Sequence, residues 1–538
     1  MKNRSLKKVI SLFLTGMLAA SVLAGCNNTP GTGSTGSPAQ SGSSESGSAA
    51  QEYNGNDVSE PVELLQYYTG DAPKDLEVIR TELNKRLKED INASVTMKNI
   101  PLADMATKYS LTIGSGEPID LIMSGTGTYY AQEASKGAFA EVTEEVLTKY
   151  MPLTNKYQAP ASLEQAKING KIYFLPNNSA KVNANTVIIR GDLREKYGLD
   201  PLETPEDLKG FYQKVVENEQ GSNMFPFAAS QKNDLKGILF TQANDYIGIG
   251  SSTMGEYYYF KYQSDPVQED DIIYALEDPA YLEFLKEMKE WSDLGFWSKS
   301  AIANNTDPKD TFLAGGAASY TSNLGTCGVV ANDIMNNHPE WKPEIYDLTP
   351  ESAKVKGTYI DGGYAVLASS ENKERAFMYL DLIKHDQEYY TLCRYGIEDI
   401  YWVDEGPYDG EEYFGYYSTT DKSPDYPFGN PTTWGNKNER FERANKGMFP
   451  DQKELGNKWT EEAVENPMAG LTFDETAVIN EMSNINNTKV KYMNTLDLGL
   501  SEDVEGTLKA FQNEMKTSGI DKVKEELVKQ INAYNESR

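Results

Sequence analysis

The sequence predicts an α/β protein made of two α/β units and a helical C-terminal segment. A chain of 538 residues is too long for one hydrophobic core and suits two or three folding units. Strands alternate with helices along residues 62–123, a pattern typical of a largely parallel sheet with helices on its faces. A similar alternation resumes at residue 186, and residues 500–537 hold two amphipathic helices broken near residues 517–519.

The first unit is expected to contain three strands and two helices. Residues 62–68, 93–98 and 119–123 are short apolar or alternating runs, as strands require. Residues 76–88 carry apolar side chains three and four positions apart, and residues 105–113 are also expected to be helical. Because ligands collect at the carboxyl ends of the strands in such sheets, the loops after the first and third strands are candidate binding loops.

The second unit begins with a strand at residues 186–189. A helix at residues 205–217 follows, with Thr204 as its N-cap and a proline at its first position. Residues 280–294 are predicted to form a helix with a strong apolar face, and residues 364–383 a strand followed by a helix. No repeat of roughly 20–50 residues recurs along the chain, which excludes a solenoid.

Composition excludes several classes of function. The chain has 81 acidic and 51 basic residues and a formal charge of −30, which repels phosphate backbones, so no nucleic-acid partner is expected. Two histidines and three cysteines are too few for a histidine-built metal site, a zinc cluster or a disulfide scaffold, and no cofactor is predicted. The 34 tyrosines suit a carbohydrate or an apolar ligand without deciding between them.

The N-terminus is predicted to be a lipoprotein signal peptide, residues 1–25. A basic start precedes an apolar run, and the run closes with Leu-Ala-Gly-Cys at residues 23–26. This tetrapeptide resembles the lipobox of bacterial lipoproteins, in which the cysteine, here Cys26, is lipidated and becomes the first residue. An uncleaved anchor with an incidental cysteine is the alternative. Residues 26–58 are rich in Gly, Ser and Thr and are expected to form a flexible tether to the membrane.

Short segments spread over residues 60–538 resemble one protein family. They include GEPIDL at residues 116–121, KGAF at 136–139, NGKIYFLPN at 169–177, RGDLREKYG at 190–198, GIE at 396–398 and GLTFD at 470–474. In this order and spacing they are similar to the family 1 extracellular solute-binding proteins of ABC importers, in the long lipoprotein branch tied to oligosaccharide uptake in Gram-positive bacteria. The chain departs from the family pattern at residues 124–127 and 399–402, which leaves the identity of the ligand open.

The resemblance implies a two-lobed, periplasmic-binding-protein-like (type II) fold with hinge crossings near residues 181–185 and 356–361. It implies a monomeric receptor on the outer face of the cell membrane that closes over a sugar or oligosaccharide and docks on the permease subunits of an ABC importer. No catalytic role is implied. The predicted lobes are residues 59–183 with 357–400 for lobe 1, and residues 184–356 with 401–538 for lobe 2.

A sugar site needs flat aromatic faces for the C–H surfaces of the rings and short polar groups for the hydroxyls. Burial in an ordinary core is the alternative role of each aromatic candidate. The candidate ligand-binding residues are Tyr68, Ser124, Thr126 and Tyr129 at two strand ends of the first lobe, Tyr320 and Asn323 after a turn in the second, Asp361 and Tyr364 at the return crossing, and Trp434 in a polar, glycine-rich loop.

Three other functions remain open at the level of sequence. A surface glycoside hydrolase needs two carboxylates roughly 5–10 Å apart, and 81 acidic residues allow such a pair. The same fold could bind a peptide, an amino acid or a polyol, and a structural surface protein or adhesin is the third alternative. Cys327 and Cys393 are expected to be buried free thiols, with a mutual bridge as the alternative.

Overall fold

The structure is a computed structural model that describes residues 50–182, 184–219, 221, 223–231, 234–249, 254–407, 415–426 and 435–537. The predicted signal peptide, Cys26, most of the predicted tether and Trp434 lie outside the described residues. The last part of the predicted tether is folded: β1 (Glu52–Tyr53) and β2 (Asn56–Asp57) form a hairpin, and Val58 is fully buried. The predicted end of the tether at residue 58 is therefore wrong, because this hairpin packs on the body through hydrogen bonds from Asn54 to the backbone carbonyls of Thr148 and Lys149.

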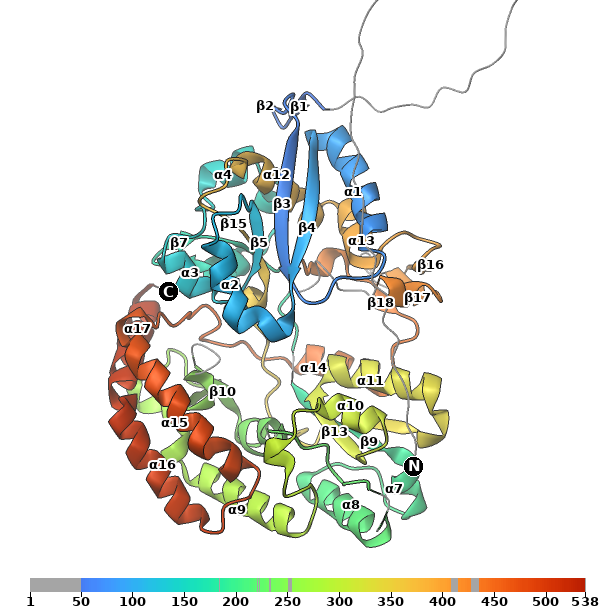
Figure 1. Ribbon diagram of the computed structural model, residues 1–538, viewed down its shortest axis with the longest axis vertical. Helices are drawn as coiled ribbons and strands as arrows, with labels where there is room; N and C mark the ends of the chain where they lie inside the picture. The colour runs from blue at the N-terminus through green and yellow to red at the C-terminus, as the bar shows by residue number, and fades with distance from the viewer. Residues whose placement is uncertain are drawn as a thin grey trace, which may run out of the picture. The chain divides into compact units, whose positions relative to one another are not determined.

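The first lobe is built on a mixed five-stranded sheet with the order β4-β3-β5-β15-β8 (Figure 1). Strand β3 runs parallel to its neighbours β4 and β5, which confirms the strand–helix alternation that the sequence predicts. Strand β15 comes from the later crossing and pairs antiparallel with β5 and β8. The strands are β3 (Val62–Thr69), β4 (Ala93–Ile100), β5 (Leu121–Ser124), β8 (Leu175–Pro176) and β15 (Gly363–Val366), and the main helices are α1 (Leu76–Ile91), α2 (Met105–Ile113), α12 (Lys373–His385) and α13 (Gln387–Tyr395).

The hydrophobic core of the first lobe extends beyond residue 400. Trp402, Tyr417 and Tyr426 are buried in the same cluster as the side chains of β3 and α1. The indole N–H of Trp402 donates a hydrogen bond to the Gly396 carbonyl at 3.1 Å, which holds the start of β16 (Trp402–Pro407) against the end of α13. The prediction that residues 401–538 belong to the second lobe is therefore wrong for this stretch, because its aromatic side chains complete the first core.

The second lobe has a small sheet with β9 in the middle and β13 and β14 on either side, both antiparallel to it. This pairing differs from the parallel arrangement of the first unit. Helix α8 (Pro205–Asn218) begins as predicted, with Thr204 and Asp207 forming a reciprocal capping box. The strands of this sheet are β9 (Asn185–Arg190), β13 (Ser319–Asn323) and β14 (Pro343–Tyr346). A second three-stranded sheet has the order β10-β11-β12, with β10 at Tyr246–Gly248, β11 at Tyr258–Lys261 and β12 at Ile273–Tyr274.

The C-terminal segment consists of three helices that share one core with the second lobe. Helices α15 (Ile479–Asp497), α16 (Val504–Ser518) and α17 (Ile520–Ser537) follow one another, and α15 and α16 lie beside α9 (Pro279–Asp293) (Figure 1). The predicted break falls at Gly519, whose φ of 97° ends α16. The two predicted helices are confirmed, and α15 is a third that the sequence analysis did not identify.

The chain passes between the two lobes at the segments that the sequence predicts. Val182 forms an antiparallel bridge with Lys356, so the first crossing and the return crossing lie side by side. The adjacent Val355 pairs in parallel with Val464. A third passage, which the sequence did not predict, lies between Phe441, packed against the first core, and Phe449, buried in the second lobe.

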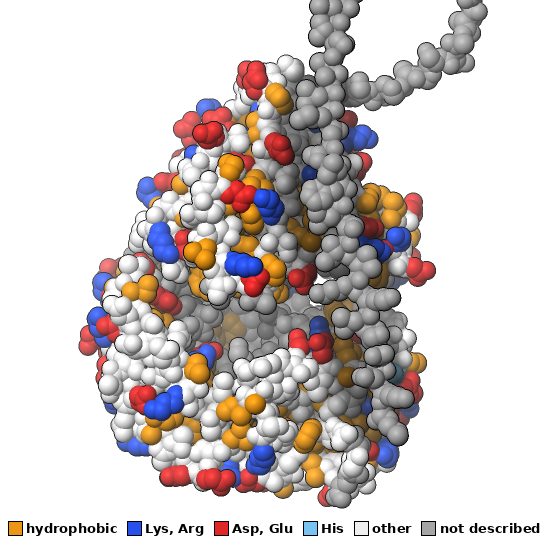
Figure 2. All heavy atoms as spheres, viewed as in Figure 1, with side chains coloured by type: hydrophobic (Ala, Val, Ile, Leu, Met, Phe, Trp, Pro, Cys, Tyr) orange, Lys and Arg blue, Asp and Glu red, His pale blue; other side chains and the backbone are white. Residues whose placement is uncertain are grey.

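Acidic and basic side chains are interspersed on the face of the body that Figure 2 shows. Exposed ion pairs of the body, such as Lys286 with Glu505, contribute little to stability because water screens them. Cys327 and Cys393 are both buried, and neither forms a disulfide with another described residue. Among the described residues, no helix combines the length and the apolar character that a membrane span requires.

Lys384 is a lysine buried inside the first lobe, and no carboxylate of the described residues forms an ion pair with it. Its ammonium nitrogen donates hydrogen bonds to the carbonyls of Pro176 at 2.7 Å and Gly435 at 3.1 Å, and only 1% of the residue is exposed. Burial lowers the pKa of Lys384 to about 7. The side chain therefore joins α12, β8 and the segment that begins at residue 435.

We expect the stability of the protein to rise between about pH 7 and pH 10 because of Lys384. In this range the unfolded chain holds a proton on this lysine, whose ordinary pKa is about 10.4, and the folded chain does not. Urea unfolding across the range should show that Lys384→Met removes this part of the slope. Lys373→Met, a partly exposed position on the same helix, should keep it. Equal slopes for the wild type and Lys384→Met would contradict the assignment.

Candidate functional site

A pocket of about 470 Å³ opens in the second lobe where several elements meet. They include the end of β13, the start of β9, a π-helical turn (Gly237–Thr241), strand β11 with the turn before it, and helix α15. A volume of this size is within the range of small-molecule sites, about 300–1,000 Å³. Two of the predicted residues, Tyr320 and Asn323, line it together with Thr321 and Asn185.

The end of β13 gives the pocket one aromatic wall and several polar groups. The ring of Tyr320 stacks on Phe312, with 6.4 Å between centroids and 22° between planes, so its orientation is fixed from behind. The Thr321 hydroxyl is buried without a hydrogen-bond partner among the described residues. Asn323 serves as the N-cap of α11 (Leu324–Asn337), with its side-chain oxygen accepting from the Thr326 amide at 3.0 Å. The polar side chain of Asn323, which the sequence pattern assigned to ligand binding, therefore also has a structural role as a helix cap.

The far side of the pocket is charged. The Lys236 ammonium lies 3.4 Å from an Asp497 carboxylate oxygen, and the Tyr281 hydroxyl donates to the other oxygen at 2.6 Å. Burial lowers the pKa of Lys236, but the Asp497 carboxylate together with Tyr259 and Glu256 outweighs burial, so the net pKa is raised and the lysine stays charged. A second ion pair joins Lys489 to Glu256. The lysines of the pocket are thus both matched by carboxylates.

The first lobe gathers three predicted residues at one edge of its sheet. Gly125, directly after β5, approaches Asp361 so closely that a Cβ at this glycine would lie 2.7 Å from the Asp361 carbonyl oxygen. The Asp361 carboxylate accepts a hydrogen bond from the Asn177 side chain at 2.8 Å and lies 3.2 Å from the Lys437 ammonium. Thr126 and Tyr129 are exposed just after Gly125, and their turn contacts the one that holds Asp361.

The other first-lobe candidates lie beneath this edge. At most 1% of the surface of Tyr68, Ser124 and Tyr364 is exposed. These three residues are therefore buried almost completely, which was the alternative to a role in ligand binding. The Tyr68 hydroxyl nevertheless has no hydrogen-bond partner among the described residues, and burial raises its pKa to about 12, which keeps it protonated. The Ser124 hydroxyl is likewise buried without a hydrogen-bond partner among the described residues. Trp434 lies outside the described residues.

The charged half of the pocket could not be recognised in the sequence. Lys236 and Glu256 come from two separate segments, whereas Lys489 and Asp497 both lie on α15, and together the four form no local motif. The available signal was the spacing of positions 489, 493 and 497, which share one face of a helix. That spacing does not distinguish a pocket wall from an ordinary packed face.

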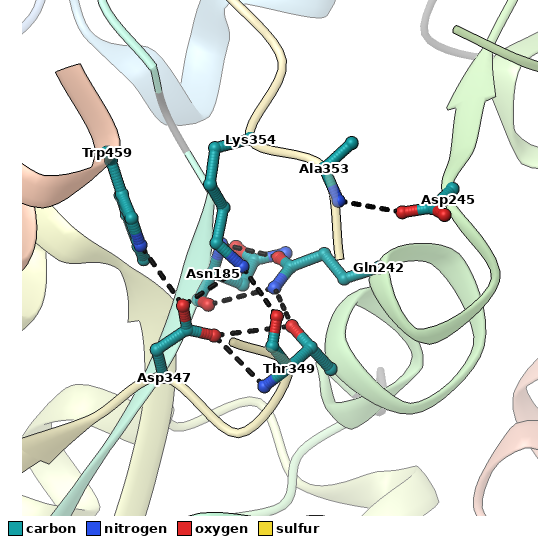
Figure 3. Close-up of polar contacts among 8 residues, drawn as sticks. All are labelled: Asn185, Gln242, Asp245, Asp347, Thr349, Ala353, Lys354 and Trp459. Atoms are coloured by element: carbon teal, nitrogen blue, oxygen red, sulfur yellow. Dashed lines mark hydrogen bonds and ion pairs between the residues drawn. The ribbon is translucent and has the colours of Figure 1, made fainter. Parts of the chain in front are cut away.

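A buried polar network supports the hinge side of the pocket (Figure 3). The Asn185 amide, at the pocket edge, donates to the Gln242 side-chain oxygen at 2.6 Å, and Gln242 donates in turn to the Asn185 carbonyl and the Thr349 hydroxyl. Close by, the Lys354 ammonium lies 2.9 Å from Asp347, which also accepts from the indole N–H of Trp459 at 3.0 Å. Lys354 directly precedes the paired crossing residues, so this network fixes where the crossing enters the second lobe.

We expect Asp347→Ala to lower the free energy of unfolding by about 3–5 kcal/mol, because it leaves the Lys354 ammonium buried without its charge partner. Glu465→Ala is the matched control, since it breaks the exposed pair with Lys356 in the same crossing and should cost no more than about 1 kcal/mol. Urea unfolding measures both. Equal losses in the two variants would show that the buried network does not support the crossing.

Two family models match separate parts of the chain. The model of bacterial extracellular solute-binding proteins matches residues 82–392, and a model of a domain of unknown function matches residues 467–536, which contain α15 and α16 and most of α17. A carbohydrate ABC transporter substrate-binding protein of Streptococcus pneumoniae is 24% identical over 485 residues, which cover 88% of this chain and 90% of the relative.

Solved structures share the fold over nearly the whole chain. The N-glycan transport solute binding protein NgtS of Streptococcus pneumoniae is 22% identical with a TM-score of 0.69, covering 89% of this chain and 99% of NgtS. NgtS has also been solved with Man1GlcNAc and with Man5GlcNAc. The alginate-binding protein AlgQ2 is 14% identical with a TM-score of 0.63, covering 88% of this chain and 98% of AlgQ2. These likenesses show the two-lobed solute-binding fold.

Proposed function

The chain belongs to the bacterial extracellular solute-binding proteins, and we propose that it captures a neutral sugar or oligosaccharide and delivers it to the permease subunits of an ABC importer. The pocket of the second lobe and the edge of the first lobe at Asp361 are the two walls of the proposed site. Closure of the lobes about the crossings at residues 182 and 356 would bring both walls onto the ligand. The carbohydrate relatives support this choice of ligand.

The observation that carries the proposal is the chemistry of the pocket. Tyr320 offers a ring held by a stacked neighbour, and Thr321, Asn323 and Asn494 offer hydroxyl and amide groups around it. Such a set suits a ligand that is apolar on its faces and rich in hydroxyls at its edges. Both lysines that line the pocket are already paired with carboxylates, so neither is available to pair with an anionic ligand.

The proposed receptor is a lipid-anchored monomer that binds without catalysis. Residues 1–25 would be removed as a signal peptide, and lipidation of Cys26 would hold the body at the outer face of the membrane. A single acyl chain binds membranes only marginally, so two or three chains on this cysteine suit a stable anchor. A surface glycoside hydrolase and a receptor for a peptide or another non-sugar solute are the alternatives that an experiment must separate.

The proposal predicts that the full chain binds Man1GlcNAc, Man5GlcNAc or maltose in isothermal titration, leaves the sugar intact, and does not bind an alginate oligosaccharide. Tyr320→Leu keeps apolar volume but removes the ring face, and should weaken binding about tenfold, which corresponds to about 1.4 kcal/mol. Tyr262→Ala, a tyrosine outside the pocket in the same lobe, should bind like the wild type. Chromatography of the sugar after incubation completes the test. Hydrolysis, or binding of peptides in place of sugars, would overturn the proposal.

A further inference from the structure

Helix α15 lies in the C-terminal segment that matches a domain of unknown function, and it reaches the pocket of the second lobe. We propose that this helix is a specificity-determining wall of the ligand site, so that the C-terminal segment takes part in recognising saccharide hydroxyls as well as in packing. The inference rests on the proposed function and deepens it. The side chains that carry it are Lys489, Met493, Asn494 and Asp497.

The placement of these residues follows from the helix itself. Positions 489, 493 and 497 recur every four residues and therefore share one face of α15, with Asn494 beside them. The neighbouring positions point elsewhere: the Val490 side chain is 75% exposed, and Lys491 pairs with Glu514 of α16. One narrow face of the helix thus lines the pocket.

Two ion pairs fix this face against the rest of the lobe. Asp497, near the end of α15, pairs with Lys236 beside the π-helical turn and accepts the Tyr281 hydroxyl of α9. About two helical turns toward the N-terminus, Lys489 pairs with Glu256. Because charges that are mostly buried need both partners and good geometry, these contacts hold the helix at a defined distance from the pocket.

The polar groups of α15 that line the pocket have the chemistry that a saccharide requires. The Lys489 ammonium is only partly covered, with 23% of its side chain exposed, and donates hydrogen bonds, whereas the Asn494 amide both donates and accepts. A hydroxyl can accept from Lys489 while it donates to the Glu256 carboxylate, so the pair binds it without becoming unpaired. An anionic saccharide would instead meet the carboxylates of Asp234, Glu256 and Asp497.

Lys489 and Lys491 provide a matched pair for the test, because they lie on the same helix and only the first lines the pocket. Isothermal titration of the full chain with Man1GlcNAc, Man5GlcNAc and maltose should show that Lys489→Met weakens binding at least fivefold, and that Lys491→Met stays within twofold of the wild type. Hydrogen exchange with bound sugar should slow in residues 479–497 and not in residues 504–518. If Lys489→Met fails to fold, Asn494→Ala takes its place with the same expected loss.

The outcomes separate the two proposals. A wild type that binds none of these sugars would overturn the proposed function and this inference with it. A wild type that binds, with a change below fivefold in Lys489→Met, or in Asn494→Ala where it replaces that variant, would overturn the role of α15 and leave the proposed function standing. Equal losses in Lys489→Met and Lys491→Met would also overturn it, since they would indicate a general effect of removing charge from the helix.

Discussion

The ion pair between Lys236 and Asp497 is the contact on which the second-lobe pocket depends. Both groups are largely withdrawn from water, and the Tyr281 hydroxyl supplies a further hydrogen bond to the carboxylate. Breaking such a pair on one side leaves a buried charge without compensation, which is far more costly than losing an exposed pair. The pair therefore holds the C-terminal helices against the pocket, so that α15 forms a rigid wall that a ligand can contact.

The lobes differ in how they present polar groups. In the first lobe the mixed sheet collects Thr126, Tyr129 and Asp361 at one edge, as expected for strand ends. In the second lobe the small antiparallel sheet supplies only part of the pocket, and helices supply the rest. The two crossings are paired at Val182 and Lys356, and the buried Asp347–Lys354 ion pair lies next to them. These contacts restrict the number of segments about which one lobe can rotate against the other.

Local sequence patterns predicted the elements better than the site. Residues 105–113 and the break at Gly519 were predictable because helix periodicity and glycine conformation are local properties. The packing of Trp402 and Tyr417 into the first core was not, since a run of aromatic residues carries no information about which of two cores it joins. The same limit applies to Lys236 and Asp497, which meet only because the C-terminal helices fold back onto the second lobe.

A crystal structure of the protein grown with Man5GlcNAc tests the central claim most directly, because it locates the ligand without recourse to variants. The account predicts the sugar against the ring of Tyr320 with hydroxyls within hydrogen-bond distance of Lys489 or Asn494, and Asp361 of the first lobe closed over its other side. A sugar bound away from the second-lobe pocket, or an intact pocket that holds no sugar at saturating concentration, would contradict it.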